Sequence, residues 1–469
     1  MSAFSLATAL VLALALILGG GTFHGLPGDV VAQLASLPLL GVALLRLRRA
    51  PTDRFGRLAL LWLGLVAVVI LVQCLPLPYP IWTQLSGRAD LAADLRAAGV
   101  AAGAHPLSLD VHATERALWT LLPAAAIFIA MLTLSSADRR RLTAVTLAIA
   151  AVSVALGLAQ VAAGRDSALR FYLPTNPSEA VGFFANRNHY AALLYMALML
   201  ATAWLAGLVV ARRELQPVPV LRVIAIALVG VLLILGLVLS RSRAGIMLGM
   251  FGLIGSVAVA WSIARRDRRA TRVVTMTAML GIALAIQYGL WGVLARLQND
   301  PLDDARWTFL HVTLDAAHRF APFGSGFGTF LHAYQNFETR DVTMSVIANH
   351  AHDDWAESWL EGGWPAAVLA ALFLVWFAVG AVRVWRRRQS DPVSTALARA
   401  APIAILLVLL HELTDYPLRT TADMTVFALM CGLLTATPRS TGHRDFPSAP
   451  ERVAKFGRGS GRTPRSESK

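Results

Sequence analysis

The sequence has little charge for its length, and almost none of that charge is lysine. Only 15% of the 469 residues are charged, whereas 56% are hydrophobic. A soluble domain of this size needs far more charged surface, so the composition indicates a protein whose solvent is lipid. Lysine occurs only at positions 455 and 469, so nearly all of the +14 net charge comes from arginine. These arginines collect in short loops, which explains the charge without nucleic acid.

Cysteine is nearly absent as well. Cys74 and Cys431 each lie in or beside an apolar run, and two such thiols make neither a disulfide framework nor a metal cluster. No basic residue precedes the first apolar stretch, 1–20. We therefore interpret this stretch as a first membrane helix rather than a cleaved signal peptide.

What the sequence has in abundance is apolar runs of about 20 residues, the length that spans a bilayer as a helix. They predict an all-α polytopic membrane protein with about 12 transmembrane helices. The runs are 3–20, 29–45, 58–75, 115–134, 142–162, 188–210, 221–239, 244–264, 273–294, 363–384, 398–412 and 423–437.

Arginine gathers in every second loop, which predicts that these loops and both termini are cytoplasmic. The remaining loops are then periplasmic, and the largest, 296–362, lies between the ninth and tenth spans. We expect this loop to cover a cavity in a membrane domain of residues 1–437. The basic tail, 438–469, is predicted to be disordered and cytoplasmic. The arginine-rich loops are 46–57, 139–141, 212–222, 265–272 and 383–399.

Arginines on the opposite side are the more informative ones. Arg241 and Arg243 stand between two spans with almost no loop, and charge so close to hydrocarbon is usually functional. A guanidinium matches phosphate oxygens, and Arg243 also opens the next helix, whose N-terminus favours an anion. The alternative is that these side chains reach lipid head groups. Arg306 opens a predicted amphipathic helix in the large loop, where a single arginine is more often a surface residue.

The run His350-Ala351-His352-Asp353-Asp354 precedes the tenth span. A histidine beside carboxylates at a membrane entrance suits a general base that takes a proton from a sugar hydroxyl. One alternative is simple capping of the helix by the two aspartates. The other is a metal site of the His-x-His-x-Asp type, which is less favoured because such sites need a large soluble domain.

If the tenth helix begins near this run, His352 shares one helix face with Trp355, Trp359 and Gly363. An acidic stripe then lies beside that face, formed by Asp353, Glu357 and Glu361.

Three further patterns lie on the same side of the membrane. The run 186–189, Asn-Arg-Asn-His, precedes the sixth span, and His411 and Asp415 share a helix face at the end of the eleventh. Either group could line a polar cavity or simply end a helix. The glycine-rich turn 324–328 follows no strand, so we interpret it as a tight turn that seats the large loop rather than a nucleotide-binding loop.

These patterns together resemble the O-antigen ligase and polymerase family of bacterial envelope glycosyltransferases. The resemblance covers about residues 182–437, and its segments occur in the family's order. They are Gly182-Phe183-Phe184-Ala185-Asn186-Arg187-Asn188-His189, Ser240-Arg241-Ser242-Arg243-Ala244-Gly245, Arg306-Trp307, Pro322-Phe323-Gly324-Ser325-Gly326-Phe327-Gly328, Asn349-His350-Ala351-His352-Asp353-Asp354-Trp355, and His411 with Asp415.

The resemblance implies a metal-independent inner-membrane transferase of the C-type glycosyltransferase class, with no cofactor. Such enzymes take a glycan from undecaprenyl pyrophosphate at the periplasmic face and pass it to a hydroxyl of lipid A core or of a lipid-linked glycan. The family's arginines fall on Arg243 and Arg306, which would bind the leaving pyrophosphate, and its histidine falls on His352. We predict as substrate-binding residues Arg241, Arg187, Asn188, Asp353, Glu361, His411 and Asp415.

The sequence departs from the family pattern at three positions, which leaves the acceptor open. Asp353 replaces an amide or serine, Glu412 replaces a small residue, and Ala366 stands where a glycine is common.

A 12-span secondary transporter or a lipid-oligosaccharide flippase is the alternative. Asp53-Arg54-Phe55-Gly56-Arg57 resembles the loop signature of the major facilitator family. That family usually has a long central cytoplasmic loop, which this chain lacks.

Overall fold

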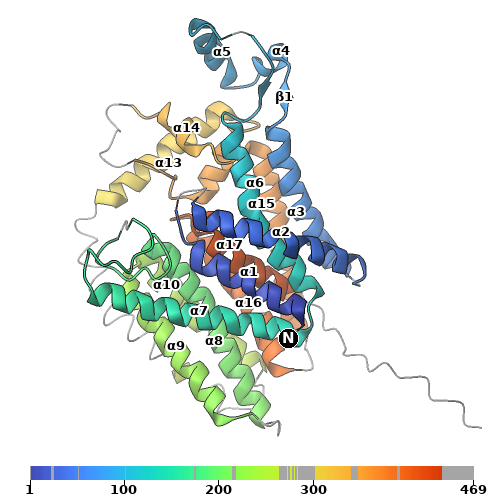
Figure 1. Cartoon of the computed structure of the whole chain (residues 1–469), viewed down its shortest axis with the longest axis vertical. Helices are drawn as coiled ribbons and strands as arrows, with labels where there is room; N and C mark the ends of the chain where they lie inside the picture. The colour runs from blue at the N-terminus through green and yellow to red at the C-terminus, as the bar shows by residue number, and fades with distance from the viewer. Residues whose placement is uncertain are drawn as a thin grey trace, which may run out of the picture.

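The computed structural model of the chain describes residues 2–22, 26–50, 52–100, 102–173, 176–213, 218–263, 301–339, 347–387 and 391–435, with isolated positions between 272 and 283. This part of the chain is mostly helical (Figure 1). Its strands are β1 (Pro76–Leu77) and β2 (His105–Pro106), which pair antiparallel.

Nine helices within the described residues are long and apolar enough to cross a membrane. Two shorter apolar helices, α1 (Ala3–Leu18) and α17 (Thr421–Thr435), accompany them. These eleven coincide with eleven of the twelve predicted runs, which confirms an all-α polytopic membrane protein. The run 273–294 and the tail 438–469 lie outside the described residues, apart from isolated positions in the run. The nine are α2 (Pro27–Arg48), α3 (Arg54–Gln73), α6 (Val111–Thr133), α7 (Ser136–Ala162), α8 (Arg187–Arg213), α9 (Val220–Ser240), α10 (Arg243–Ile263), α15 (Asp354–Arg386) and α16 (Pro392–His411).

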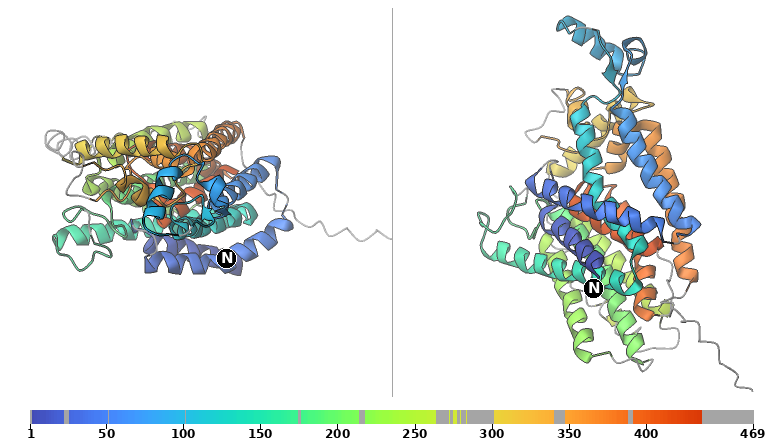
Figure 2. Two further views of the ribbon diagram at one scale, coloured as in Figure 1. Left: turned by 90° about the horizontal axis from the view of Figure 1, so that it is seen from above. Right: turned by 45° about the vertical axis from the view of Figure 1, so that its right-hand side comes forward.

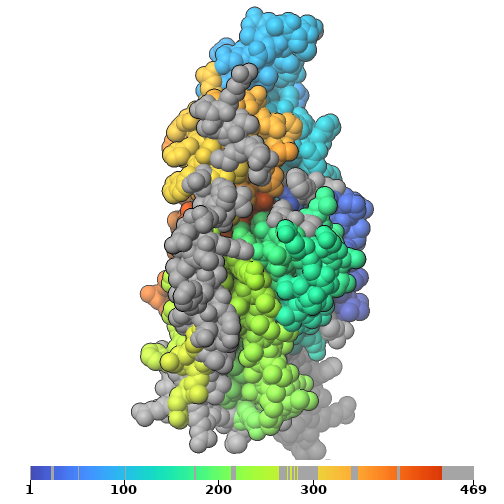
Figure 3. Space-filling model, turned by 90° about the vertical axis from the view of Figure 1, so that its left-hand side faces the viewer, coloured from blue at the N-terminus to red at the C-terminus, as the bar shows by residue number. Residues whose placement is uncertain are grey.

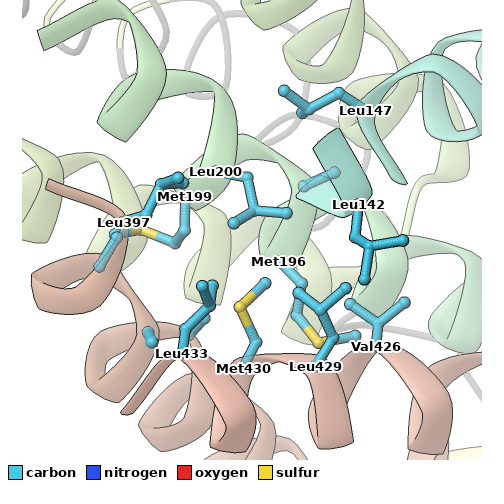
Figure 4. Packing of buried hydrophobic residues seen from close by; sticks show 14 of the residues in the cluster. Leu142, Leu147, Met196, Met199, Leu200, Leu397, Val426, Leu429, Met430 and Leu433 are labelled. Carbon is cyan, nitrogen blue, oxygen red and sulfur yellow. The ribbon is translucent and has the colours of Figure 1, made fainter. Parts of the chain in front are cut away.

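Helix α8 lies at the centre of the packed spans. It is apolar on every face, as expected of a helix that is buried all round, and it contacts α9, α10 and α16. Figure 4 shows Met196, Met199 and Leu200 of α8 packed against side chains of α7, α16 and α17. Seen from above, α1 and α2 line one face of the molecule and α13 (Pro301–Phe320) lies at the opposite face (Figure 2).

The first long loop projects from the rest of the chain (Figure 3). It contains the two strands with α4 (Tyr79–Trp82) and α5 (Arg88–Ala97). The buried guanidinium of Arg88 donates hydrogen bonds to the carbonyls of Leu107 and Gly324, at 2.5 and 3.2 Å. Arg88 therefore joins this loop to the glycine-rich turn of the second one.

The glycine-rich turn seats the second loop on α15, as predicted. That loop contains α13 and α14 (Phe330–Gln335), and α15 has a kink at Gly363, with φ 54° and ψ −144°. The amides of Ser325 and Gly326 donate to the carbonyls of Leu360 and Glu361, both at 2.9 Å, and the Trp364 amide donates to Pro322. The turn thus satisfies backbone groups that the kink leaves exposed.

Replacing Gly363 by alanine is expected to destabilise the protein by roughly 3 kcal/mol or more. A Cβ at this position would lie 2.2 Å from the Pro322 carbonyl oxygen, and its φ is unfavourable for any other residue. Thermal unfolding in one detergent measures the change. Gly41→Ala is the control because a Cβ there meets nothing within 4 Å. The control should gain roughly 0.5–1 kcal/mol from helix propensity, and equal melting of the two variants would refute the prediction.

The segment that resembles the major facilitator signature has a local role in this fold. The Asp53 carboxylate accepts a hydrogen bond from the Gly56 amide at 2.9 Å and so caps α3. It also pairs with Arg383 near the end of α15. Helix capping and one ion pair therefore explain this segment without a transport function.

Candidate active site

Asp415 contacts polar side chains from three other parts of the chain. It lies between α16 and the short 3₁₀ helix η2 (Pro417–Arg419), and its side chain is 1% exposed. The Nδ1 atom of His352 lies 3.2 Å from Oδ1, and the Asn188 amide donates a hydrogen bond to Oδ2. His189 Nε2 lies 3.6 Å from Oδ1, and an Arg306 nitrogen lies 3.9 Å from Oδ2. We call these five residues the Asp415 cluster.

The cluster keeps Asp415 ionised. Burial by itself would raise the pKa of this carboxyl, but the imidazoles of His189 and His352 hold the pKa well below its ordinary range. An ionised carboxylate can only accept hydrogen bonds, so Nδ1 of His352 carries the proton in their contact. In the neutral ring, Nε2 then holds the lone pair and can accept a proton from a substrate.

Aromatic rings hold the His352 imidazole in place. Phe309 stacks on it with ring centres 6.1 Å apart, and Tyr416 meets it edge-on at 5.1 Å. The side chain of His352 nevertheless remains 19% exposed. A histidine that is oriented by a carboxylate and still reachable is suited to general-base chemistry.

The backbone at His352 differs from the sequence prediction. Helix α15 begins at Asp354, and Asp353 caps it by accepting a hydrogen bond from the Ala356 amide at 3.0 Å. His352 lies before the cap with φ 54°. The prediction that His352 shares a helix face with Trp355 is therefore wrong, because the helix begins only after the Asp353 cap. The capping interpretation of Asp353 is confirmed.

A second buried network lies beside the cluster. Arg419 pairs with Asp354 at 2.5 Å, Glu361 at 2.8 Å and Glu357 at 3.3 Å. Glu357 also lies 2.7 Å from His350 Nδ1. We call these five residues the Arg419 network.

In this network, the predicted acidic stripe of α15 faces other side chains of the protein rather than an open cavity. Glu361 is fully buried, and its carboxylate also accepts a hydrogen bond from the Phe330 amide at 3.0 Å. The structure thus places Glu361 with Arg419, apart from the Asp415 cluster. Sequence reasoning missed Arg419, although it is an arginine in a loop predicted to be periplasmic.

The two histidines of the His-x-His-x-Asp run contact different carboxylates, Glu357 for His350 and Asp415 for His352. The described residues contain no group of three or more His, Cys, Asp and Glu side chains placed to hold a metal ion.

The other predicted site residues lie around the cluster. Arg187 pairs with Glu179 at 3.2 Å, at the start of α8. His411 is buried one helical turn before Asp415, with its Nδ1 3.2 Å from the Tyr195 hydroxyl. Arg241 is exposed in the hairpin between α9 and α10, and Arg243 begins α10.

The α9–α10 hairpin packs closely on the start of α8. A Cβ on Gly245 would lie 2.3 Å from the Ala191 Cβ, so only a glycine lets these two helices approach so near. The hairpin therefore brings Arg243 to the end of α8 that carries Asn188 and His189.

Comparison with known proteins connects this geometry to a family. Residues 228–371 match the family model described as O-antigen ligase. The match includes Arg241, Arg243, Arg306 and His352, whereas Asn188 and Asp415 lie outside it. No curated protein matches the chain. The match favours a transferase over the transporter alternative. The chain is thus a polytopic membrane protein in which residues 228–371 match the O-antigen ligase family.

Proposed function

We propose that this protein is a metal-independent inner-membrane glycosyltransferase that moves a glycan from undecaprenyl pyrophosphate to an acceptor hydroxyl. The contact between His352 and the ionised Asp415 carries the proposal. It orients the imidazole and leaves Nε2 for the acceptor, in the way a carboxylate orients the histidine of a hydrolase triad.

In this reaction the acceptor oxygen attacks the anomeric carbon of the donor glycan, and its proton passes to His352 Nε2. The bond between that carbon and the pyrophosphate oxygen breaks, and the electron pair leaves with the pyrophosphate. Arg306, next to Asp415, and Arg243 would stabilise the negative charge that develops on it. Arg241, Arg187 and Asn188 would hold the donor beside them.

The two ends of the spans support a periplasmic position for the Asp415 cluster. The basic loops meet at one end, where Arg140 pairs with Asp391 at 2.6 Å and Arg383 pairs with Asp53. The Asp415 cluster lies at the other end of α8 and α16. Since basic loops stay in the cytoplasm, we place both termini there and the cluster at the periplasmic face.

Arg306→Ala is expected to lower kcat/KM for the lipid-linked donor by about 10²–10³-fold, because the variant lacks a cation beside the leaving group. Transfer by purified protein in lipid bilayers measures this value. Arg116→Ala is the matched control, because Arg116 is a half-exposed arginine with one 4.0 Å contact to Asp110. Equal activity of the two variants would remove Arg306 from the site.

A genetic experiment tests the function as a whole. A deletion strain of the native host would receive the wild-type gene or its His352→Ala variant, with membrane protein levels matched by immunoblot. The wild type should restore surface polysaccharide, while the variant accumulates the lipid-linked intermediate. Full restoration by the variant would reject the transferase proposal at this site. The length distribution of the restored product separates ligation from polymerisation.

A further inference from the structure

Four helices line a half-open apolar cavity next to the Arg419 network. It has a volume of about 370 Å³ and lies between α3, α6, α15 and α17, with its outer end bounded by residues near the start of α15 and the end of α16. This volume lies within the range of pockets that hold small-molecule ligands.

The three tryptophans that line the cavity offer a ligand no free hydrogen-bond donor, and the indole nitrogen of Trp355 donates to the Leu409 carbonyl at 3.2 Å. The indole nitrogen of Trp62 donates to the Leu369 carbonyl at 2.8 Å, and that of Trp376 donates to the Phe55 carbonyl at 3.3 Å. The rest of the wall consists mostly of alanine, leucine and phenylalanine side chains. Such a wall fits a hydrocarbon chain.

Polar groups gather at one end of the cavity, where Asp354, Ser358, Glu412 and Arg419 line it. Glu412 is 3% exposed, and its Oε1 accepts a hydrogen bond from the Leu418 amide at 3.0 Å. Its Oε2 is buried and accepts no hydrogen bond from the described residues, while the Glu412 carboxyl lies within hydrogen-bonding reach of the Asp354 carboxyl. A buried polar atom without a partner is unfavourable, so a ligand that supplies one would be stabilised there.

The charges at this end disfavour a phosphate. The guanidinium of Arg419 is already neutralised by Asp354, Glu357 and Glu361. Burial and the nearby Asp354 carboxylate also raise the pKa of Glu412 well above its ordinary value, so its neutral form can exchange hydrogen bonds with a hydroxyl. The excess of carboxyl groups thus favours a neutral, hydroxyl-bearing head over an anion.

We propose that this cavity binds the hydrocarbon chain of an amphiphile whose head is neutral and carries hydroxyl groups, with one hydroxyl bonded to Glu412. Two of the three positions at which the sequence departs from the family pattern, Glu412 and Ala366, line this cavity. The ligand preference is therefore a property of this chain.

The cavity and the proposed reaction centre share the same two chain segments. His352 contacts Asp415, and Asp354 contacts Arg419. Asp354 is two residues after His352, and Arg419 is four residues after Asp415. His352 does not itself line the cavity, so a sugar head at the polar end would reach it by extending past Asp354. This step rests on the proposed function: the bound amphiphile is the acceptor of the glycan.

Binding can be tested without any transfer reaction. The wild-type protein in nanodiscs would be irradiated with an alkyl glucoside that carries a diazirine in its chain, or with the matching alkyl phosphate. The glucoside should label peptides of α3, α15 and α17 and the phosphate should not. Equal labelling by both probes, or labelling outside the cavity helices, would overturn the proposal.

Two neighbouring alanines on α15 provide a matched pair of variants. Ala370 lines the cavity, whereas Ala371 is exposed on the outer side of the helix. Ala370→Phe should lower the labelling about tenfold, as expected from excluding about two methylene groups, and Ala371→Phe should leave it unchanged. Ala124→Phe fills the cavity from α6. It provides a second filling variant in case Ala370→Phe does not fold. Unchanged labelling in both filling variants would contradict the proposal.

Kinetics then separate this inference from the proposed function. Ala370→Phe should raise KM for an alkyl-glycoside acceptor about tenfold and leave KM for the lipid-linked donor unchanged. A rise in the donor KM instead would show that the chain belongs to the donor and would overturn the assignment. A wild-type protein that binds the glucoside but transfers no glycan would contradict the proposed function and leave the binding inference intact. A wild-type protein that transfers glycan but is not labelled by the glucoside would contradict the binding inference and leave the proposed function intact.

Discussion

His352→Ala is expected to lower kcat for glycan transfer by about 10²–10⁴-fold, the range that a positioned general base contributes. Asp415→Asn should reduce it by a comparable factor. An asparagine amide can donate to Nδ1 of His352, and the ring proton then moves to Nε2, where it blocks the base. Because the two residues act as one unit, the double variant should be no slower than the worse single variant. Single-turnover transfer with purified protein measures these values.

His318→Ala is the control for this pair, because His318 is an exposed histidine on α13. It should transfer glycan at the wild-type rate. If the losses of the two single variants instead multiplied in the double variant, His352 and Asp415 would act independently, and the base-orienting role of Asp415 would be refuted.

Arg419→Ala is expected to destabilise the protein by about 3–5 kcal/mol, the effect of removing one partner of a buried ion pair. The variant would leave Glu357 and Glu361 buried, with their side chains 0% exposed, and without their shared cation. Thermal unfolding in detergent, followed together with protease resistance, measures the change. Arg419→Met combined with Glu361→Gln should recover part of the loss, since it removes the unpaired charge along with the cation.

Arg319→Ala provides the matched comparison, because it removes an arginine from an exposed ion pair with Asp90. Exposed pairs contribute about 0–1 kcal/mol, so this variant should melt close to the wild type. If Arg419→Ala also melted there, the Arg419 network would not stabilise the fold.

The sequence by itself determined the spans, and it predicts the side of the membrane on which each loop lies. Eleven apolar runs became helices that end within three residues of their predicted bounds and begin up to nine residues earlier, because a stretch of lipid-exposed backbone must satisfy its hydrogen bonds internally. That rule is local and can be read from hydropathy. The role of the glycine-rich turn was also predictable, since glycine adopts the positive φ found at Gly324, Gly326 and Gly328 without steric cost.

The candidate site was predictable only as a set of residues. Arginines outside the cytoplasmic loops and the pair His411 and Asp415 drew attention by position, but their contacts could not be read from spacing. Asn188 and Asp415 are 227 positions apart, and they meet because α8 and α16 pack side by side. Such pairings depend on how the spans assemble.

Only the tertiary structure decided that Asp415 is the centre of the site, that His352 lies before α15, and that Arg419 neutralises the acidic stripe. It also decided where the apolar cavity lies, because a cavity is a property of four helices together. The physical reason is common to all four. Hydropathy acts on one segment at a time, whereas hydrogen bonds, ion pairs and packing act between segments that the sequence alone does not bring together.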